Sequence, residues 1–215
     1  MKEDDIRYAK LLVLVNGAVP LAVLGWDAAH HQLGANPQNF AILTTGMMTL
    51  IFLILTMAVT PLRKVTGWNW LANLRRMLGL YAFFYGCAHF LLFFGLDRGF
   101  SVSSTLTEMA KRKYLIIGST ALIVMIPLAV TSTNAMIKRL GGKRWRALHR
   151  LAYVAAICGV IHYYMQVKAD VRQPLVFAAV LTVLLGYRVL AYVRQRKPVP
   201  MAVAAKTDGN ADKGS

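Results

Sequence analysis

The chain has 215 residues, of which 57% are hydrophobic and 16% are charged, yet 25 Lys and Arg against 9 Asp and Glu give it a formal charge of +16. Soluble domains are typically about 45–50% apolar and a quarter charged, so this composition indicates a membrane protein. The apolar fraction excludes a disordered chain, the two Cys exclude a disulfide scaffold, and the alternation of apolar blocks with basic stretches disfavours a nucleic-acid partner.

Apolar blocks recur along the chain, each close to the roughly 20 residues with which an α-helix crosses about 30 Å of hydrocarbon. The six blocks are Lys10–Trp26, Ala41–Leu62, Met77–Leu96, Tyr114–Thr133, Ala147–Val167 and Pro174–Val193. The first is the weakest, since it is short, contains Asn16 and Pro20, and resembles a signal-peptide core. The acidic residues before it and the lack of a convincing cleavage site favour a span instead. The sequence therefore predicts an all-α membrane protein, a six-helix transmembrane bundle.

Basic residues fall mainly on one side of this predicted bundle. That side receives Lys2, Arg7, Lys10, Arg63, Lys64, Arg75, Arg76, Lys138, Arg139, Lys143, Arg144, Arg146, Arg150, Arg188, Arg194, Arg196, Lys197, Lys206 and Lys213. The other side has Arg98, Lys111, Arg112, Lys113, Lys168 and Arg172. Short cytoplasmic loops retain Lys and Arg, so we expect cytoplasmic termini and basic loops against the headgroups of the lipid bilayer. The expected organisation is a cytoplasmic segment (1–9), a six-helix domain (10–193) and a disordered cytoplasmic tail (194–215).

Three of the five His lie in or beside the apolar blocks. His89 and His162 are well inside the third and fifth blocks, and His149 is near the start of the fifth. An ionisable side chain at membrane depth is costly and predicts a function. The remaining pair, His30 and His31, falls in a loop and supplies too few ligands for a closed metal site.

Small residues precede both membrane-depth histidines at helical spacing. The two stripes are Gly79, Ala82 and Gly86 before His89, and Ala152, Ala155 and Gly159 before His162. Ordinary small-residue helix packing would explain either stripe alone. Two matched stripes on parallel helices, with both imidazoles at one level, favour a haem b with two axial histidines. A proton relay is the competing interpretation, but it would normally recruit Asp or Glu, and none of the blocks contains one.

His149 and the nearby arginines are ambiguous. On an uninterrupted helix His149 would point about 140° away from His162, so the two would not share a face. The equivalent position before His89 is Arg76, which leaves His149 either as ligand of a second haem or as an interfacial residue. Arg75 and Arg76, with Arg144 and Arg150, could bind haem propionates or a flavin phosphate, although topology explains them equally well. Cys87 and Cys158 lack a C-x-x-C-H motif, which excludes covalent haem attachment.

Short motifs recur in a fixed order between Leu33 and Arg188. They are GANP (34–37), TPLR (60–63), RRMLGL (75–80) before His89, Arg112 to Tyr114, LAVTST (128–133), WRALH (145–149) with Tyr153, and IHY (161–163) with Lys168. In this order the chain resembles the MsrQ (YedZ) family, the haem-binding membrane subunits of the methionine sulfoxide reductase system within the ferric-reductase-like transmembrane superfamily.

The resemblance implies six transmembrane helices in the bacterial inner membrane, one or two haem b groups on His89, His149 and His162, and non-covalent FMN. It also implies electrons from quinol or a cytosolic flavin reductase, and a periplasmic molybdopterin-dependent, MsrP-like reductase as acceptor. The chain would be an electron-transfer subunit and not a self-contained enzyme. Leu43, Lys113 and Met165 depart from the family pattern, so a b-type cytochrome with another acceptor stays an alternative. A non-redox membrane scaffold or transporter is the second alternative.

Overall fold

All regular elements in residues 3–195, the range that the computed structural model describes, are helices. In chain order they are α1 (Glu3–Ala29), α2 (Pro37–Thr66), the 3-10 turn η1 (Asn69–Asn73), α3 (Arg75–Leu92), the π-helical turn η2 (Phe93–Asp97), α4 (Val102–Lys111), α5 (Lys113–Val130), α6 (Asn134–Leu140), α7 (Gly142–Leu148), α8 (Leu151–Gln166) and α9 (Arg172–Gln195). The all-α prediction is confirmed. Beyond Gln195, the predicted tail lies outside the described residues.

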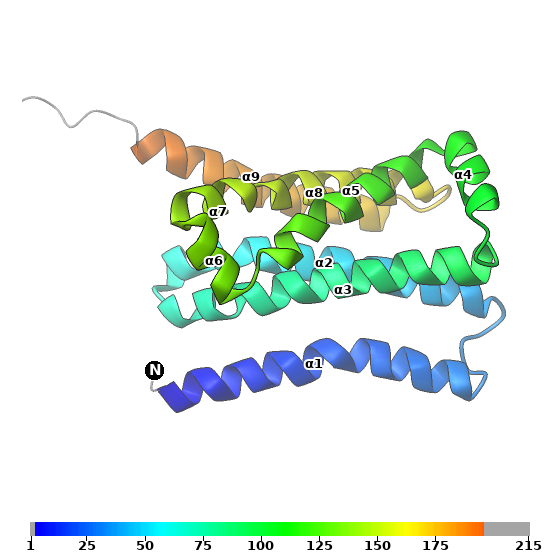
Figure 1. The fold of residues 1–215 in the computed structure, drawn as a ribbon, viewed down its shortest axis with the longest axis horizontal. Coiled ribbons are helices and arrows are strands. Elements are labelled where there is room, and N and C mark those ends of the chain that lie inside the picture. Colours follow the sequence, from blue (N-terminus) through cyan, green and yellow to red (C-terminus); the bar gives the residue numbers. More distant parts are fainter. Residues whose placement is uncertain (1–2, 196–215) are drawn as a thin grey trace, which may run out of the picture.

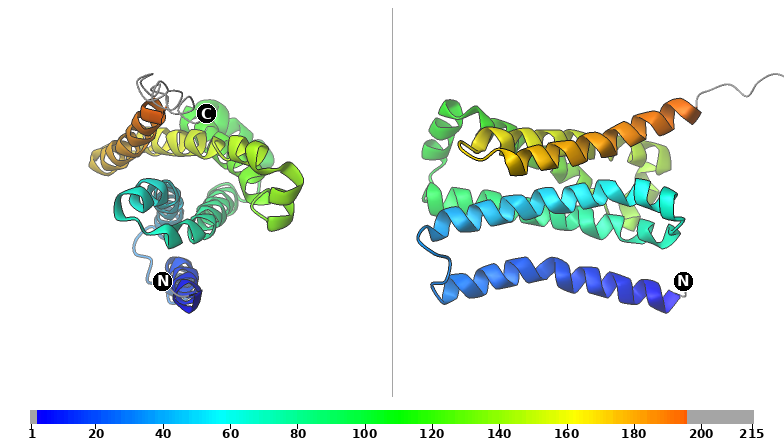
Figure 2. Two further views of the ribbon diagram at one scale, coloured as in Figure 1. Left: turned by 90° about the vertical axis from the view of Figure 1, so that its left-hand side faces the viewer. Right: turned by 180° about the vertical axis from the view of Figure 1, so that it is seen from behind.

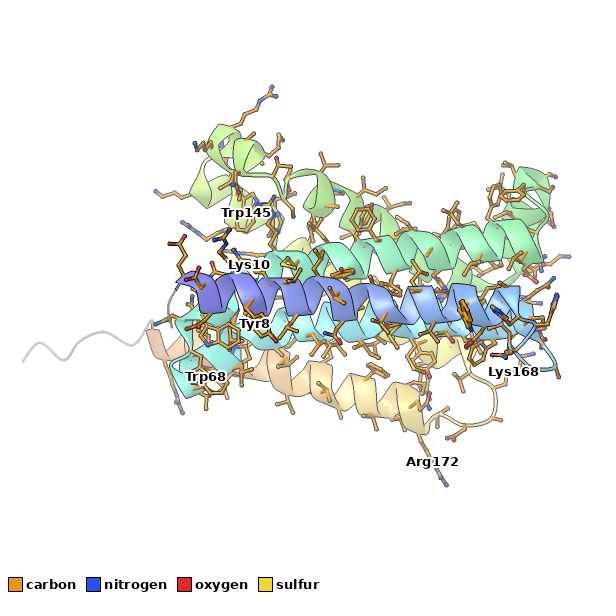
Figure 3. The ribbon with its side chains drawn as sticks, turned by 90° about the horizontal axis from the view of Figure 1, so that it is seen from below. Tyr8, Lys10, Trp68, Trp145, Lys168 and Arg172 are labelled. Carbon is orange, nitrogen blue, oxygen red and sulfur yellow. The ribbon has the colours of Figure 1, made fainter. Side chains whose placement is uncertain are left out.

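The long helices run roughly parallel to one axis and form three layers (Figure 1). α1 lies alone on one side, α2 and α3 form the middle layer, and α5, α8 and α9 form the third, as the end-on view also shows (Figure 2). Both ends of the described chain lie at the same end of the bundle as α6 and α7, and α4 lies at the opposite end. The two groups of basic residues are therefore separated, with Lys10 at one end and Lys168 and Arg172 at the other (Figure 3).

By length and composition, five helical stretches of the described chain could cross a membrane: α1, α2, Asn69–Asp97, α5 and Arg172–Arg194. Large apolar side chains on them point outward, among them Phe84, Ile123 and Val183, which are 62%, 62% and 70% exposed. An aqueous domain would bury such residues, whereas a lipid-facing surface accommodates them. The predicted block at 147–167 is broken after α7, and the resulting α8 has 16 residues. It is thus shorter than the other candidate spans.

Tyrosines of α3 hold α1 against the middle layer. Pro20 interrupts the backbone ladder of α1. The Tyr85 hydroxyl enters the opening, donating to the Gly17 carbonyl at 2.8 Å and accepting from the Leu21 amide at 3.1 Å. The Tyr81 hydroxyl donates to another carbonyl of α1 and its ring lies against Gly17. Tyr85 thus bonds the pair one residue beyond the Asn16 carbonyl that Pro20 leaves without its helical donor, and α3 holds α1 beside its proline.

A second proline is compensated by Arg188. Pro61, inside α2, has no N–H to donate to the carbonyl of Met57 one turn earlier. Arg188 of α9 donates Nη2 to that carbonyl at 2.8 Å and Nη1 to the Tyr153 hydroxyl of α8 at 2.6 Å. Its guanidinium carbon also lies 5.0 Å from the centre of the Tyr153 ring. One side chain thus connects α9 to α2 and α8.

This arrangement predicts an energetic coupling between Arg188 and Pro61. Replacing Arg188 with Met should lower the free energy of unfolding by about 1.5–3 kcal/mol, the usual range for hydrogen bonds with a charged donor. The loss should be smaller in a Pro61→Ala background, because the restored amide then satisfies the Met57 carbonyl. Unfolding of the parent, both single variants and the double variant in detergent measures the coupling. Equal losses in both backgrounds would mean that the carbonyl is not what Arg188 stabilises.

Candidate functional site

A cavity of about 370 Å³ lies between two extensively packed helix pairs, α2 with α3 and α5 with α8. His89 of α3 and His162 of α8 both line it. Its inner wall consists of apolar and small side chains, including Leu50, Leu53, Gly86, Ala155 and Gly159. Polar residues line the part near α4, including Asn36, Gln38, Asn39, Arg112 and Gln166.

The structure brings the two membrane-depth imidazoles together. The ring centres of His89 and His162 are 6.1 Å apart and the ring planes make an angle of 84°. A bond of about 2.0 Å from a metal to each of two imidazole nitrogens places the ring centres on the order of 6 Å apart. The observed separation therefore fits two rings that bind opposite sides of one metal.

Both imidazoles are oriented by the same kind of hydrogen bond. His89 Nδ1 lies 2.8 Å from the Ile42 carbonyl of α2, and His162 Nδ1 lies 2.7 Å from the Tyr114 carbonyl of α5. A carbonyl only accepts, so Nδ1 carries the proton and Nε2 has a free lone pair in each neutral ring. Within residues 3–195 neither Nε2 has a hydrogen-bond partner. Metal-binding histidines need this tautomer, and they need a hydrogen-bond partner on the other ring nitrogen to hold the ring in place.

Glycines on the facing helices create the space for these bonds. A Cβ on Gly46 of α2 would lie 2.9 Å from His89 Nδ1, and a Cβ on Gly118 of α5 would lie 2.6 Å from His162 Nδ1. Each glycine is four residues after the carbonyl that accepts from the histidine. Each helix pair thus has the same arrangement, a carbonyl that accepts from the histidine and a glycine four residues later that leaves room for the ring. Sequence reasoning missed Gly46 and Gly118; the only available signal was a glycine within an apolar helix.

The small-residue stripes pack helices as well as lining the cavity. Ala82 and Ala155 are completely buried. The Gly86 position in α3 faces Leu122 of α5, and the Gly159 position in α8 faces Leu50 of α2, with Cβ-to-methyl distances of 3.3 and 3.4 Å. The stripes therefore let the two helix pairs approach each other closely. Helix packing therefore explains these small residues, so the haem hypothesis depends on the two histidines.

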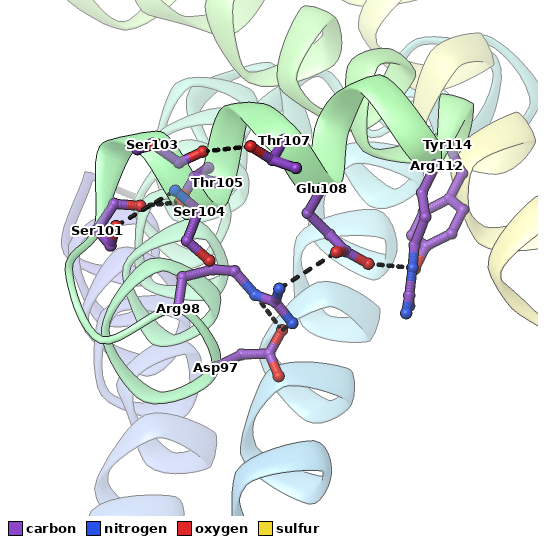
Figure 4. A network of polar contacts seen from close by, with 10 residues as sticks. All are labelled: Asp97, Arg98, Ser101, Ser103, Ser104, Thr105, Thr107, Glu108, Arg112 and Tyr114. Atoms are coloured by element: carbon purple, nitrogen blue, oxygen red, sulfur yellow. Dashed lines mark hydrogen bonds and ion pairs between the residues drawn. The ribbon is translucent and has the colours of Figure 1, made fainter.

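An ion-pair network holds α4 across one end of the bundle (Figure 4). Arg98 lies 2.7 Å from Asp97 and 3.3 Å from Glu108, and Glu108 also pairs with Arg112. Arg112 in turn donates to the Tyr114 hydroxyl at 3.1 Å, and these bonds raise the pKa of Arg112. The network fixes the start of α5, the segment whose Tyr114 carbonyl orients His162. The sequence predicted a loop here and not a helix.

His149 lies far along the bundle from the other two and on a different element. It caps the end of α7, so the helical angle expected between His149 and His162 does not apply. Its ring stacks on Trp145 with centres 4.0 Å apart, and Nε2 lies 3.1 Å from the Thr131 hydroxyl. Burial, and secondarily the charge of Arg75, lower the pKa of His149. The ring is therefore kept neutral, with Nδ1 free of protein partners in the described chain.

The structure separates the two arginines that begin α3. Arg75 is half-buried and near His149, whereas Arg76 is exposed and donates to the Asn134 side chain of α6 at 2.7 Å. His30 stacks on Trp26 in the loop after α1, as a solvated residue would. Within residues 3–195, no group of three or more His, Cys, Asp and Glu is arranged to hold a metal ion. His89 and His162, which line one cavity, are two histidines and do not form such a group by themselves.

Comparison with known proteins identifies the family of this chain. Residues 40–160 match the family model described as ferric reductase like transmembrane component. Proteins named as the heme-binding subunit MsrQ of protein-methionine-sulfoxide reductase are 45% identical in Herminiimonas arsenicoxydans, over 95% of this chain and 94% of that protein, and 48% identical in Ralstonia nicotianae, over 86% of each. The Rhodospirillum rubrum relative is 45% identical over 91% of this chain and 94% of its own. With these matches and several membrane-length helices, the chain belongs to the MsrQ family of multi-pass, ferric-reductase-like transmembrane proteins.

Proposed function

We propose that this protein is the haem-binding membrane subunit of a protein-methionine-sulfoxide reductase system and relays electrons one at a time through the bilayer. The observation that carries the proposal is the pair His89 and His162, with ring centres 6.1 Å apart beside a common cavity. Relatives that are 45% and 48% identical to this chain are named for heme binding, which agrees with a haem at this pair.

His89 and His162 would hold one haem b through their Nε2 atoms. When bound there, the group would supply one-electron redox chemistry. The Ile42 and Tyr114 carbonyls hold each Nδ1–H, and so keep both Nε2 lone pairs available and the rings in place. The apolar inner wall of the cavity would limit the access of water to a bound haem and, with the two neutral imidazoles, would help to set its reduction potential.

His149 is proposed as ligand of a second or alternative haem site at the opposite end of the bundle. Its neutral, half-buried ring and its distance along the bundle from the His pair support this assignment. Among residues 3–195, the partner of the His149 ring is on Nε2, which leaves Nδ1 as the nitrogen that would bind the metal. Arg75, which lies near His149, is proposed to bind an anionic group of a cofactor. Arg76, which is exposed, is proposed to contribute to the same binding site from its solvent-facing edge. FMN as a further cofactor is supported by the family resemblance alone.

The electron path would begin at quinol or a cytosolic flavin reductase and end at a periplasmic molybdopterin-dependent, MsrP-like reductase that repairs oxidised methionines. The protein would lie in the bacterial inner membrane. With α8 as the sixth span, the two described chain ends fall at the same end of the bundle, and the larger number of Lys and Arg at that end favours the cytoplasm. Membership of the MsrQ family supports these partners.

The proposal predicts a haem spectrum from the purified full chain. Dithionite-reduced minus oxidised difference spectra in detergent should show the α band of a b-type cytochrome. A pyridine haemochrome assay on the same sample gives the ratio of haem to protein, which separates one site from two. Absence of the α band from protein made in haem-sufficient cells would overturn the proposal and leave a non-redox membrane scaffold or transporter.

A further inference from the structure

A guanidinium group is held inside the bundle without a carboxylate. Arg188 is anchored by the Met57 carbonyl and the Tyr153 hydroxyl, and it leaves its Nε buried without a hydrogen-bond partner. These contacts hold the side chain among α2, α8 and α9, where it cannot extend freely to the membrane surface. An unpaired charge in such a place is unfavourable unless an anion compensates it.

Two more arginines lie close to Arg188. Arg75, at the start of α3, is near enough to Arg188, Arg63 and the Tyr153 hydroxyl for their charges to interact. None of these three arginines forms an ion pair in the described part of the chain, where the ion pairs involve Arg7, Arg98, Arg112 and Arg172. Arg75 therefore lies near both of the other arginines and near the Tyr153 hydroxyl that Arg188 contacts.

The acidic side chains of the described chain do not supply the missing charge. Asp27, Asp97, Glu108 and Asp170 belong to the opposite end of the bundle. Glu3, Asp4 and Asp5 begin α1, the helix in the outer layer, and are exposed. A counter-ion for the arginines must therefore come from outside the described residues.

We propose that Arg75, Arg188 and Tyr153, with Arg63 at the rim, form a binding site for a phosphate group. Arginine matches phosphate oxygens through its fixed set of N–H donors, and Tyr153, which accepts from Arg188, still has its own O–H to donate. A free phosphate or phosphomonoester carries up to two negative charges and a lipid phosphodiester carries one, and the phosphate group offers acceptor oxygens to more than one arginine. The phosphate could belong to an anionic lipid headgroup or to a soluble phosphorylated molecule.

The site extends the proposed function only through Arg75 and does not require the histidine assignment. It would also supply a counter-charge to Arg188, whose guanidinium the Met57 carbonyl and the Tyr153 hydroxyl bind without neutralising it. In the sequence, Arg188 was one of many basic residues that indicate which side of the predicted bundle faces the cytoplasm. Its position opposite a proline and beside Arg75 became visible only in the folded bundle.

The test measures stabilisation of the full chain in neutral detergent by two probes. Inorganic phosphate is titrated at constant ionic strength, and short-chain phosphatidylglycerol is compared with phosphatidylcholine. A ligand of the folded state raises the unfolding temperature in a saturable way. We expect Arg75→Gln and Arg188→Gln each to raise the apparent Kd about tenfold or more, the loss typical of a charge-assisted contact. Arg172→Gln, on the same helix as Arg188 and with a 92% exposed side chain, should leave it unchanged.

Arg75→Gln is the decisive variant, because Arg75 makes no side-chain hydrogen bond to the described chain that its loss would break. Stabilisation by inorganic phosphate supports a soluble source, and stabilisation by phosphatidylglycerol alone supports a lipid. If neither probe stabilises the parent, or if Arg75→Gln binds as the parent does, the site is wrong. Haem content is measured in the same samples. Haem without phosphate stabilisation counts against this site only, and phosphate stabilisation without haem counts against the haem proposal only.

Discussion

Replacing His162 or His89 with alanine is expected to remove the haem shared by the two side chains. Each substitution deletes one of two rings whose centres are 6.1 Å apart and leaves the other without an opposite partner. The other histidines of the described chain, His30, His31 and His149, do not line this cavity, so none of them replaces the deleted ring. Protein-bound absorbance of that haem should therefore be lost in both variants and not merely shifted.

The measurement is the reduced-minus-oxidised spectrum and the haem-to-protein ratio of each variant. His30→Ala is the control, because that ring lies in the loop after α1 and stacks on Trp26; its spectrum should match the parent. His149→Ala should remove a second haem, if one is bound, and spare the first. Full retention of the spectrum in both His89→Ala and His162→Ala would reject them as ligands.

The sequence predicted that His89 and His162 lie at one level, and the structure brings their ring centres to 6.1 Å. That prediction was possible because depth depends only on helical rise from charged landmarks. The sequence could not predict what orients the two rings. Whether Gly46 faces His89 depends on the rotation of α2 about its axis, and the apolar residues on all sides of a lipid-exposed helix give no clear periodicity to fix that rotation. The same argument applies to Gly118, and to Arg188, whose partner carbonyl is on another helix.

Other differences have local causes. The break between α7 and α8 lies at His149 and Arg150, near the start of the predicted block, where no Gly or Pro marks the end of a helix. Helix α4 is short and mostly polar, and it is held by ion pairs to Glu108 that depend on Arg98 and Arg112 meeting in three dimensions. Periodicity identifies long apolar helices, whereas elements held by a few polar contacts escape it.

Alanine at Gly118 is expected to displace His162 although it touches no proposed ligand atom of the iron. The added Cβ would lie 2.6 Å from Nδ1 and 2.7 Å from Cε1, well inside contact distance. The ring must then move off the Tyr114 carbonyl, which leaves its N–H unsatisfied. Overpacking of this kind costs typically about 1–3 kcal/mol. Haem occupancy should fall, and the absorbance that remains should differ in shape from that of the parent.

Gly46→Ala should act in the same way on His89, where the added Cβ would lie 2.9 Å from the ring. Gly186→Ala is the matched control in α9, since nothing lies within 4 Å of its Cβ position. There alanine should be neutral or stabilise by about 0.5–1 kcal/mol, its usual gain over glycine within a helix. Unfolding temperature and haem content are measured together for all three variants. Normal haem binding in both Gly46→Ala and Gly118→Ala would show that the carbonyl bonds do not position the ligands, even if the His assignment itself is correct.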